Sequence, residues 1–228
     1  MTSGLEQKRA LVLDHLLPSV EDDKPVDQAT HTMGNLIHGH VKPYERPLVD
    51  AGEPQSVLHQ LLEGNKRYHR GLYGDRLAVA DAKGNSKTRQ NLANGQTPGA
   101  AVLSCADSRV PVEAIFDQSV GDIFVVRTAG NICSPCAEGS LDYGVKHLGI
   151  KVLMVLGHAG CGAVKAAQLE SRDIKGESAA LAGLLFDIKS GLQACKTCTP
   201  EIAVAVNVRH QVAALSKNPL VKSKVSGG

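Results

Sequence analysis

The stretch AVLSCADSRV, residues 101–110, joins an apolar run to a cluster of reactive and charged side chains. The run leads to Cys105, and Asp107, Ser108 and Arg109 follow within four positions. A short continuous apolar run is typical of a strand that is buried on both faces of a parallel sheet. Groups that follow such a strand lie at its carboxyl end, where the sites of α/β proteins gather. We therefore predict a core strand that brings Cys105 to a functional edge.

The same pattern continues along the chain beyond Pro98. Short apolar runs alternate with helical segments in the order AAVLSC, PVEAIFDQ, DIFVVRT, AEGSLDYGVKHLG, KVLMVLGH and CGAVKAAQLE. Helices that separate the strands make those strands parallel. The predicted fold class is α/β, with a parallel-sheet core flanked by helices.

The first part of the chain has a different character. Leu5–Leu17 has the periodicity of a short amphipathic helix, and a mixture of proline, glycine, histidine and charge follows it without a period. A stronger helical pattern begins at Pro54, which suits a first helical turn, and ends at Gly71, which suits a cap. We predict an N-terminal helical arm over residues 1–53 and one domain over residues 54–228.

The composition excludes several classes of partner. The 228 residues carry 25 basic and 23 acidic side chains, a net charge of +2, which favours neither nucleic acid nor an anionic membrane surface. No apolar run approaches the roughly 18 residues of a membrane-spanning helix. The acidic residues near the start suit neither a secretory signal nor a transit peptide. We therefore expect a cytoplasmic protein or one of another soluble compartment, such as the chloroplast stroma.

Three residues form a candidate metal set. Cys105 ends one predicted strand, His158 ends another, and Cys161 begins the helix that follows. A cysteine at a strand end is by itself often only a small buried apolar residue. Two thiolates and an imidazole, however, are ligands that zinc prefers, and three protein ligands leave the open fourth position of a catalytic site. The set predicts bound Zn²⁺.

Asp107 and Arg109 are the charged pair beside this set. An isolated pair of this spacing is most simply a local salt bridge. Next to an open zinc position, Asp107 either accepts a hydrogen bond from zinc-bound water or occupies the fourth position itself, and Arg109 would hold it away from the metal. The sequence leaves both alternatives open.

These motifs resemble those of the β-class carbonic anhydrases, and more closely those of the plant-type subclass. The resemblance rests on CADSR, RTAGN, GHAGCG and LLEGNKRY, and it covers residues 54–216. It implies a zinc lyase, a carbonate dehydratase, that interconverts carbon dioxide and bicarbonate by zinc-hydroxide attack. Cys105, His158 and Cys161 would be its zinc ligands, and Asp107 and Arg109 its catalytic dyad.

The resemblance also implies a substrate pocket and an assembly. Gln96, Phe124 and Tyr143 match residues that line the pocket in similar proteins, and the tyrosine would reach the site of a neighbouring subunit. A homodimer or a dimer-based oligomer is therefore expected.

Two departures from the family pattern bear on these expectations. Bicarbonate-inhibited bacterial members carry a tryptophan where this chain has Val102, so we do not expect their regulatory pocket around Arg127. Members also add a strand after the helix that matches Val204–Leu215, and we expect the domain over residues 54–228 to lack it.

The other four cysteines form two CxxC pairs, Cys133 with Cys136 and Cys195 with Cys198. Such pairs occur as free thiols, as half of a structural zinc site, or as a disulfide or redox device, and the sequence does not decide among these.

Three other functions of the protein stay open: hydrolysis of carbon disulfide or carbonyl sulfide by the same ligands, a non-catalytic bicarbonate sensor or scaffold, and a zinc-ribbon interaction module.

Overall fold

Three parallel strands form the centre of the protein, as the sequence predicts. They are β1 (Ala100–Cys105), β2 (Ile123–Thr128) and β3 (Val152–Leu156), in the spatial order β2-β1-β3. In this computed structural model, residues 53–71, 90, 92–195 and 198–226 are described, so the predicted arm lies almost entirely outside them. The central strand pairs along its whole length with β2 and through Ser104 with β3.

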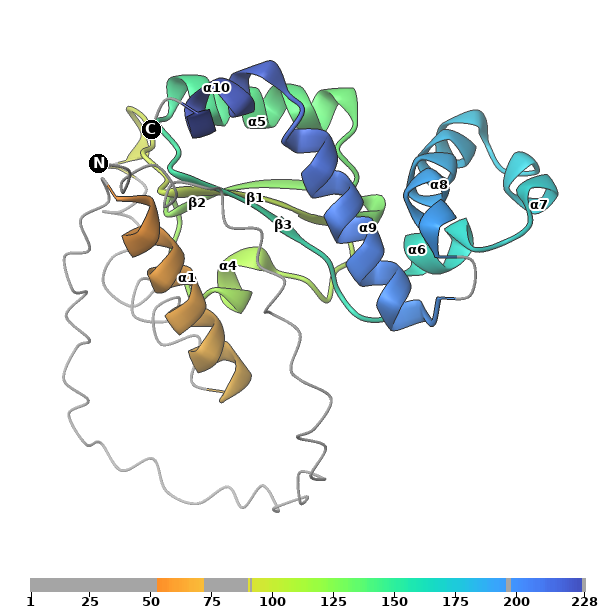
Figure 1. The fold of residues 1–228 in the computed structure, drawn as a ribbon. Helices are drawn as coiled ribbons and strands as arrows, with labels where there is room; N and C mark the ends of the chain where they lie inside the picture. The colour runs from red at the N-terminus through yellow and green to blue at the C-terminus, as the bar shows by residue number, and fades with distance from the viewer. Residues whose placement is uncertain (1–52, 72–89, 91, 196–197, 227–228) are drawn as a thin grey trace, which may run out of the picture.

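Helices cover both faces of this sheet (Figure 1). The α-helices are α1 (Pro54–His69), α4 (Val112–Ile115), α5 (Pro135–His147), α6 (Gly162–Ala167), α7 (Ser171–Lys175), α8 (Ala179–Gly191), α9 (Pro200–Leu215) and α10 (Pro219–Ser226). Two short 3₁₀ helices are η2 (Ala129–Asn131) and η3 (Leu192–Ala194). Within the described residues no fourth strand joins the sheet, because α10 follows α9.

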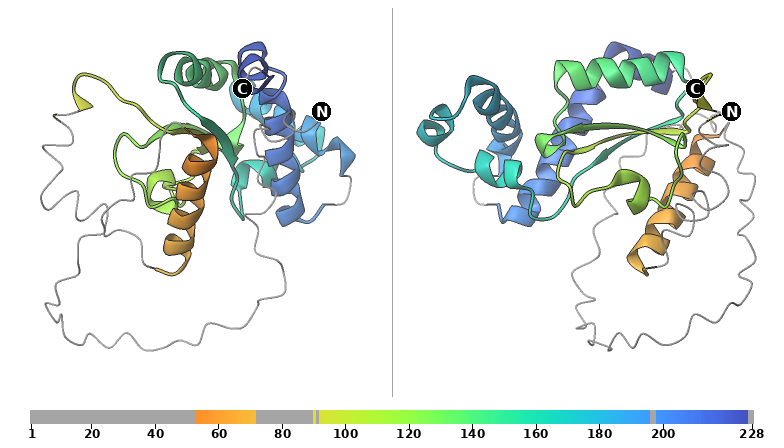
Figure 2. Two further views of the ribbon diagram at one scale, coloured as in Figure 1. Left: turned by 60° about the vertical axis from the view of Figure 1, so that its left-hand side comes forward. Right: turned by 180° about the vertical axis from the view of Figure 1, so that it is seen from behind.

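Alternate residues of β1 enter different parts of the core. Ala100 and Val102 pack with α1 and α4, whereas Ala101 and Leu103 pack with α5 on the other face. Figure 2 shows these helices on opposite sides of the strands. Every residue of β1 is buried, which explains why its sequence is a continuous apolar run rather than an alternating one.

Local capping residues set where the helices begin. The Ser134 hydroxyl accepts a hydrogen bond from the Ala137 N–H at the start of α5, and Thr199 does the same for Ile202 at the start of α9. A proline occupies the first turn of both helices and of α1.

A lobe made of α6, α7 and α8 projects from one end of the sheet (Figure 1). Its core contains Val164, Ile174, Leu185 and Ile188, and this cluster continues into Cys105 and Cys161. The lobe is therefore packed directly against the sheet edge at which the candidate metal ligands lie.

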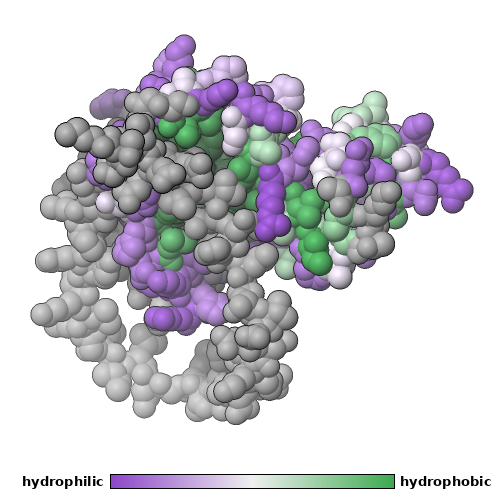
Figure 3. All heavy atoms as spheres, viewed as in Figure 1, coloured by the Kyte–Doolittle hydropathy of each residue, from purple (hydrophilic) through white to green (hydrophobic). Residues whose placement is uncertain are grey.

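The surface is of mixed polarity. Apolar residues are visible over α9 in Figure 3, where Ile202 is 51% exposed. None of the described helices has the length and hydrophobicity of a membrane-spanning segment.

The contact between α1 and α4 gives a test of this packing. A Cβ atom at Gly64 would overlap the carbonyl oxygen of Phe116, which also accepts a hydrogen bond from the Gln118 side chain. We expect Gly64→Ala to lower the free energy of unfolding by at least about 2 kcal/mol, because backbone atoms must move.

The matched control is Gly183→Ala in α8, where a Cβ atom meets nothing within 4 Å. This change should raise the free energy of unfolding by about 0.5–1 kcal/mol through helix propensity. Urea unfolding measures both variants. Equal effects of the two changes would contradict the described contact between α1 and the Phe116 carbonyl.

Candidate metal centre

The carboxyl edge of the sheet brings the three predicted ligands together. Cys105 is the last residue of β1, His158 lies two residues beyond the end of β3, and Cys161 is the N-cap of α6. One ligand atom from each of them lies within 4.8 Å of the others. The Sγ atoms of Cys105 and Cys161 are 4.0 Å apart. Two sulfur ligands at about 2.3 Å from a tetrahedral zinc would be separated by roughly 3.8 Å, so the spacing fits a metal.

The histidine is oriented for the same purpose. Its Nδ1 lies 3.1 Å from the Ala159 carbonyl oxygen, which makes Nδ1 the protonated donor nitrogen. Nε2 is then left with a lone pair, and it is buried without a hydrogen-bond partner. Metal-binding histidines commonly donate their other ring nitrogen to a carbonyl in this way. A buried, unpartnered acceptor beside two thiols is well suited to a metal ion.

The environment of the thiols favours the same conclusion. Burial raises the pKa of the Cys161 thiol, and the neighbouring Cys105 sulfur raises it further. Two thiolates in one buried place repel each other unless a cation neutralises them. A metal would therefore displace thiol protons when it binds.

Asp107 lies beside the group and is held there by Arg109. Its carboxylate accepts hydrogen bonds from the Arg109 backbone N–H at 3.0 Å, from Nε at 2.9 Å and from a terminal nitrogen at 2.7 Å. These bonds hold the pKa of Asp107 well below its usual range. One carboxylate oxygen lies 3.8 Å from His158 Nε2. Asp107 is thus an ionised acceptor next to the candidate ligands.

Two arginines join the loops at this edge. Arg109 also donates to the Gly160 carbonyl at 3.2 Å, which links the loop after β1 to the loop after β3. Arg127 on β2 donates to the Cys105 carbonyl at 2.9 Å and to the Asp107 carbonyl. Sequence analysis did not give Arg127 this role, because the partners are backbone atoms and no residue pattern reports them.

The predicted pocket residues lie elsewhere in this chain. Phe124 is the second residue of β2, whereas the candidate ligands lie beyond the far end of the strands. Its ring is 6.4 Å from that of Tyr143, which is 52% exposed. Gln96 is exposed in the segment before β1. The chain therefore joins Phe124 to Tyr143, but it does not bring either beside its own candidate ligands.

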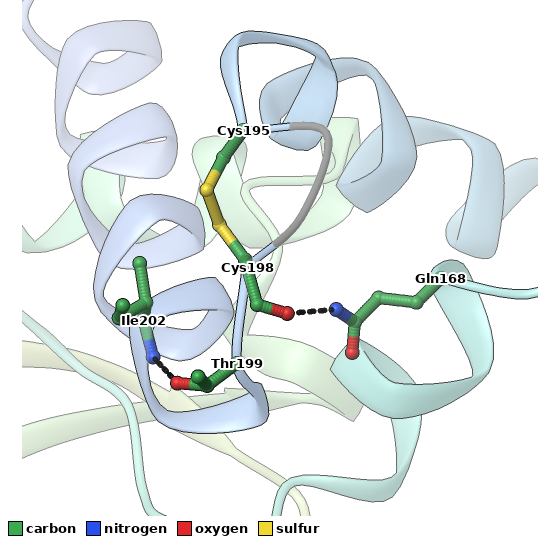
Figure 4. The surroundings of a disulfide bond; sticks show 5 residues. All are labelled: Gln168, Cys195, Cys198, Thr199 and Ile202. Carbon is green, nitrogen blue, oxygen red and sulfur yellow. Dashed lines mark hydrogen bonds between the residues drawn. A yellow bond between two sulfur atoms is a disulfide. The ribbon is translucent and has the colours of Figure 1, made fainter.

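The two CxxC pairs differ in whether their cysteines are bonded to each other. Cys195 and Cys198 form a disulfide before α9, where the Cys198 carbonyl accepts a hydrogen bond from Gln168 at the end of α6 (Figure 4). Cys133 and Cys136 are free thiols. Within the described part of the chain the only metal-capable group is that of Cys105, His158 and Cys161, so the two pairs do not form a second zinc site there.

Comparison with known proteins agrees with this geometry. The carbonic anhydrase family model matches residues 100–228. A β-carbonic anhydrase from Coccomyxa has a TM-score of 0.58 and 26% identity, over 75% of this chain and 77% of that one. The chain belongs to the β-carbonic anhydrase family. One of two tetrameric β-carbonic anhydrases from Sordaria macrospora has a TM-score of 0.55 and 28% identity, over 66% of this chain and 83% of that one.

Curated members of the β-carbonic anhydrase family match over a shorter part of their length. Carbonic anhydrase 2 of Mycobacterium tuberculosis is 44% identical over 114 residues, which are 50% of this chain and 52% of that protein. A carbonic anhydrase of Synechococcus elongatus is 29% identical over 186 residues, 75% of this chain and 64% of that protein. The chain thus spans about half the length of the mycobacterial relative and under two thirds of the cyanobacterial one.

The free cysteine pair gives a chemical test of the described environment. Burial and the nearby carboxylates of Glu138, Asp187 and Asp142 raise the pKa of Cys133 to about 11. At pH 8 roughly one Cys133 in a thousand is then a thiolate, the reactive form. Cys136 is exposed. We expect iodoacetamide to label Cys136 well before Cys133, as followed by peptide mass spectrometry. Equal labelling rates in the folded protein would contradict the partly buried placement of Cys133.

Proposed function

We propose that this protein is a zinc-dependent carbonic anhydrase that interconverts carbon dioxide and bicarbonate. The observation that carries the proposal is the buried His158 Nε2, which lies with two thiols beside an ionised Asp107. The residues fit Zn²⁺ in ligand type and spacing. Membership of the β-carbonic anhydrase family supports the same reaction.

Cys105, His158 and Cys161 would hold the zinc. The ion supplies Lewis acidity that lowers the pKa of a bound water towards neutrality. Two thiolates donate more charge than imidazoles do, so this set should make zinc a weaker acid than three histidines would. The remaining residues must therefore place the attacking water well.

Asp107 has the position and the charge state for that task. Both of its carboxylate oxygens accept hydrogen bonds from Arg109, and one of them lies 3.8 Å from His158 Nε2. In this proposal Arg109 holds the carboxylate beside the metal instead of on it. An ionised carboxylate there accepts a hydrogen bond from the attacking water and orients its oxygen towards the carbon of carbon dioxide. Arg109 acts through Asp107 by holding it ionised and in place.

The assembly would complete the pocket. Phe124 and Tyr143 lie together at the opposite end of β2 from the ligands, and Tyr143 is exposed. We assign them, with Gln96, to the substrate pocket, with Tyr143 reaching the site of a partner subunit in a dimer or dimer-based oligomer. A related protein from Sordaria macrospora is tetrameric, which supports an oligomer.

The ligand assignment is tested by metal content. Cys161→Ser removes one thiolate, and we expect the purified variant to lose its zinc, whereas the wild-type protein should hold one zinc per chain. Cys136→Ser is the control, because that free thiol is exposed at the start of α5. Elemental analysis of the reduced proteins gives the stoichiometry. Full zinc content in Cys161→Ser would refute the assignment.

The role of Asp107 is tested by replacing its carboxylate with the amide of asparagine. We expect Asp107→Asn to keep its zinc and to lose carbon dioxide hydration activity by about 100-fold or more, because the amide is a poorer acceptor and carries no charge. Asp173→Asn, a change at an exposed carboxylate of α7, should leave the rate unchanged.

Stopped-flow hydration assays beside zinc analysis separate the possible results. Near-normal hydration by Asp107→Asn would remove Asp107 from the mechanism. Zinc-loaded wild-type protein without turnover would instead favour a bicarbonate sensor or scaffold. Turnover of carbon disulfide without turnover of carbon dioxide would favour a carbon disulfide or carbonyl sulfide hydrolase.

A further inference from the structure

The loop after β2 has an unusual backbone where it meets the candidate metal ligands. Gly130 has φ 66° and Asn131 has φ 47°, so two consecutive residues adopt the left-handed conformation. This conformation is uncommon for a residue with a side chain, although asparagine adopts it more readily than most residues, and Asn131 is buried. Strain of this kind persists only where surrounding contacts enforce it, and it often accompanies function.

The loop makes a direct contact with a candidate ligand. The Gly130 N–H donates to Cys105 Sγ at a donor–acceptor distance of 3.4 Å. A hydrogen bond of this kind stabilises the thiolate and fixes the sulfur lone pair that is left for a metal. The φ and ψ angles of Gly130 set the orientation of this N–H relative to the Gly130 carbonyl, so the left-handed conformation fixes the direction of one group once the other is held.

A fully buried asparagine of α9 holds this loop. Asn207 Nδ2 donates to the Gly130 carbonyl at 2.9 Å. Its own orientation is fixed by Gln211, one turn later, whose Nε2 lies 3.3 Å from Asn207 Oδ1. Gln211 in turn accepts a hydrogen bond from the Cys133 N–H at 2.8 Å. The two amides therefore connect α9 to both ends of the loop that carries Gly130.

Packing limits the loop further. A Cβ atom at Gly130 would lie 2.6 Å from Ile188 Cδ1 of α8. The glycine thus lies close against α8 and is hydrogen-bonded to α9.

We propose that Asn207 is a positioning residue for the metal ligand Cys105. It holds the Gly130 carbonyl, which keeps the left-handed turn in place, and the turn aims the Gly130 N–H at the Cys105 sulfur. The proposal rests on the metal site of the proposed function and adds a residue of α9 to it, more than one hundred positions beyond Cys105.

The test compares two buried asparagines. Asn207→Ala removes the bond to Gly130, whereas Asn218→Ala removes bonds to Glu138 and Asp142 and the cap of α10. Both changes delete a buried amide and should lower stability, but Asn218 has no contact with the loop or the ligands among its described hydrogen bonds. The zinc dissociation constant is measured by chelator competition, and the thiolate charge-transfer spectrum is recorded after Co²⁺ substitution.

We expect Asn207→Ala to weaken zinc binding by about 10- to 100-fold and to alter the Co²⁺ spectrum, because a ligand loses its outer support. Asn218→Ala should match the wild type in both measurements. Equal zinc affinity and equal spectra for the two variants would overturn the positioning role while leaving the metal site intact. No zinc binding by the wild-type protein would instead overturn the proposed function.

A measurement on the wild-type protein covers the case in which Asn207→Ala does not fold. With an NMR-active cadmium isotope in the site, the Gly130 amide proton should show a scalar coupling to the metal through the Cys105 sulfur. Its absence in the cadmium-loaded protein would show that Gly130 makes no such hydrogen bond, and the proposal would fail.

Discussion

The pairing of β1 with a neighbour on each side is the constraint on which the site depends. A parallel strand that is hydrogen-bonded along both edges has a fixed register, so the residue after each strand end is placed with little freedom. Burial of both faces of β1 locks that register further, since a shift of one residue would exchange the side chains that meet α5 with those that meet α1. Cys105 and His158 come together because their strands end at one edge.

Side chains alone do not define the candidate metal centre. The carbonyl groups of Cys105, Asp107 and Gly160 are held by arginines, and the sulfur of Cys105 meets a backbone N–H. A loop that is held at this many points is pre-organised, so a ligand does not have to be ordered when the metal binds. The Asp107–Arg109 pair and the candidate ligand group are in this sense one connected structure, built from the ends of β1, β2 and β3.

The sequence predicts the strands and the candidate ligands, but not the contacts that hold them in place. Continuous apolar runs identify the three strands, and the separation of the strands by helices identifies their parallel arrangement. HxxC at a second strand end makes Cys105 credible as a ligand. The sequence does not reveal the contacts made to backbone groups, such as those of Arg127. Every residue has a backbone carbonyl, so no residue type marks the one that accepts a hydrogen bond. The buried role of Asn207 is not predicted either, because a polar residue in a helix is usually exposed to solvent. The fate of each CxxC pair also depends on distances that spacing does not fix.

The separation of the ligands along the chain has a mechanical consequence. Cys105 and Cys161 lie 56 residues apart in sequence, yet their sulfur atoms nearly touch. A metal held between them would act as a cross-link, closing a long loop that contains β2, α5 and β3 and thereby reducing the conformational freedom of the unfolded chain. The ion would then contribute to stability as well as to catalysis. A chelator that removes it would destabilise this edge of the sheet and also abolish activity.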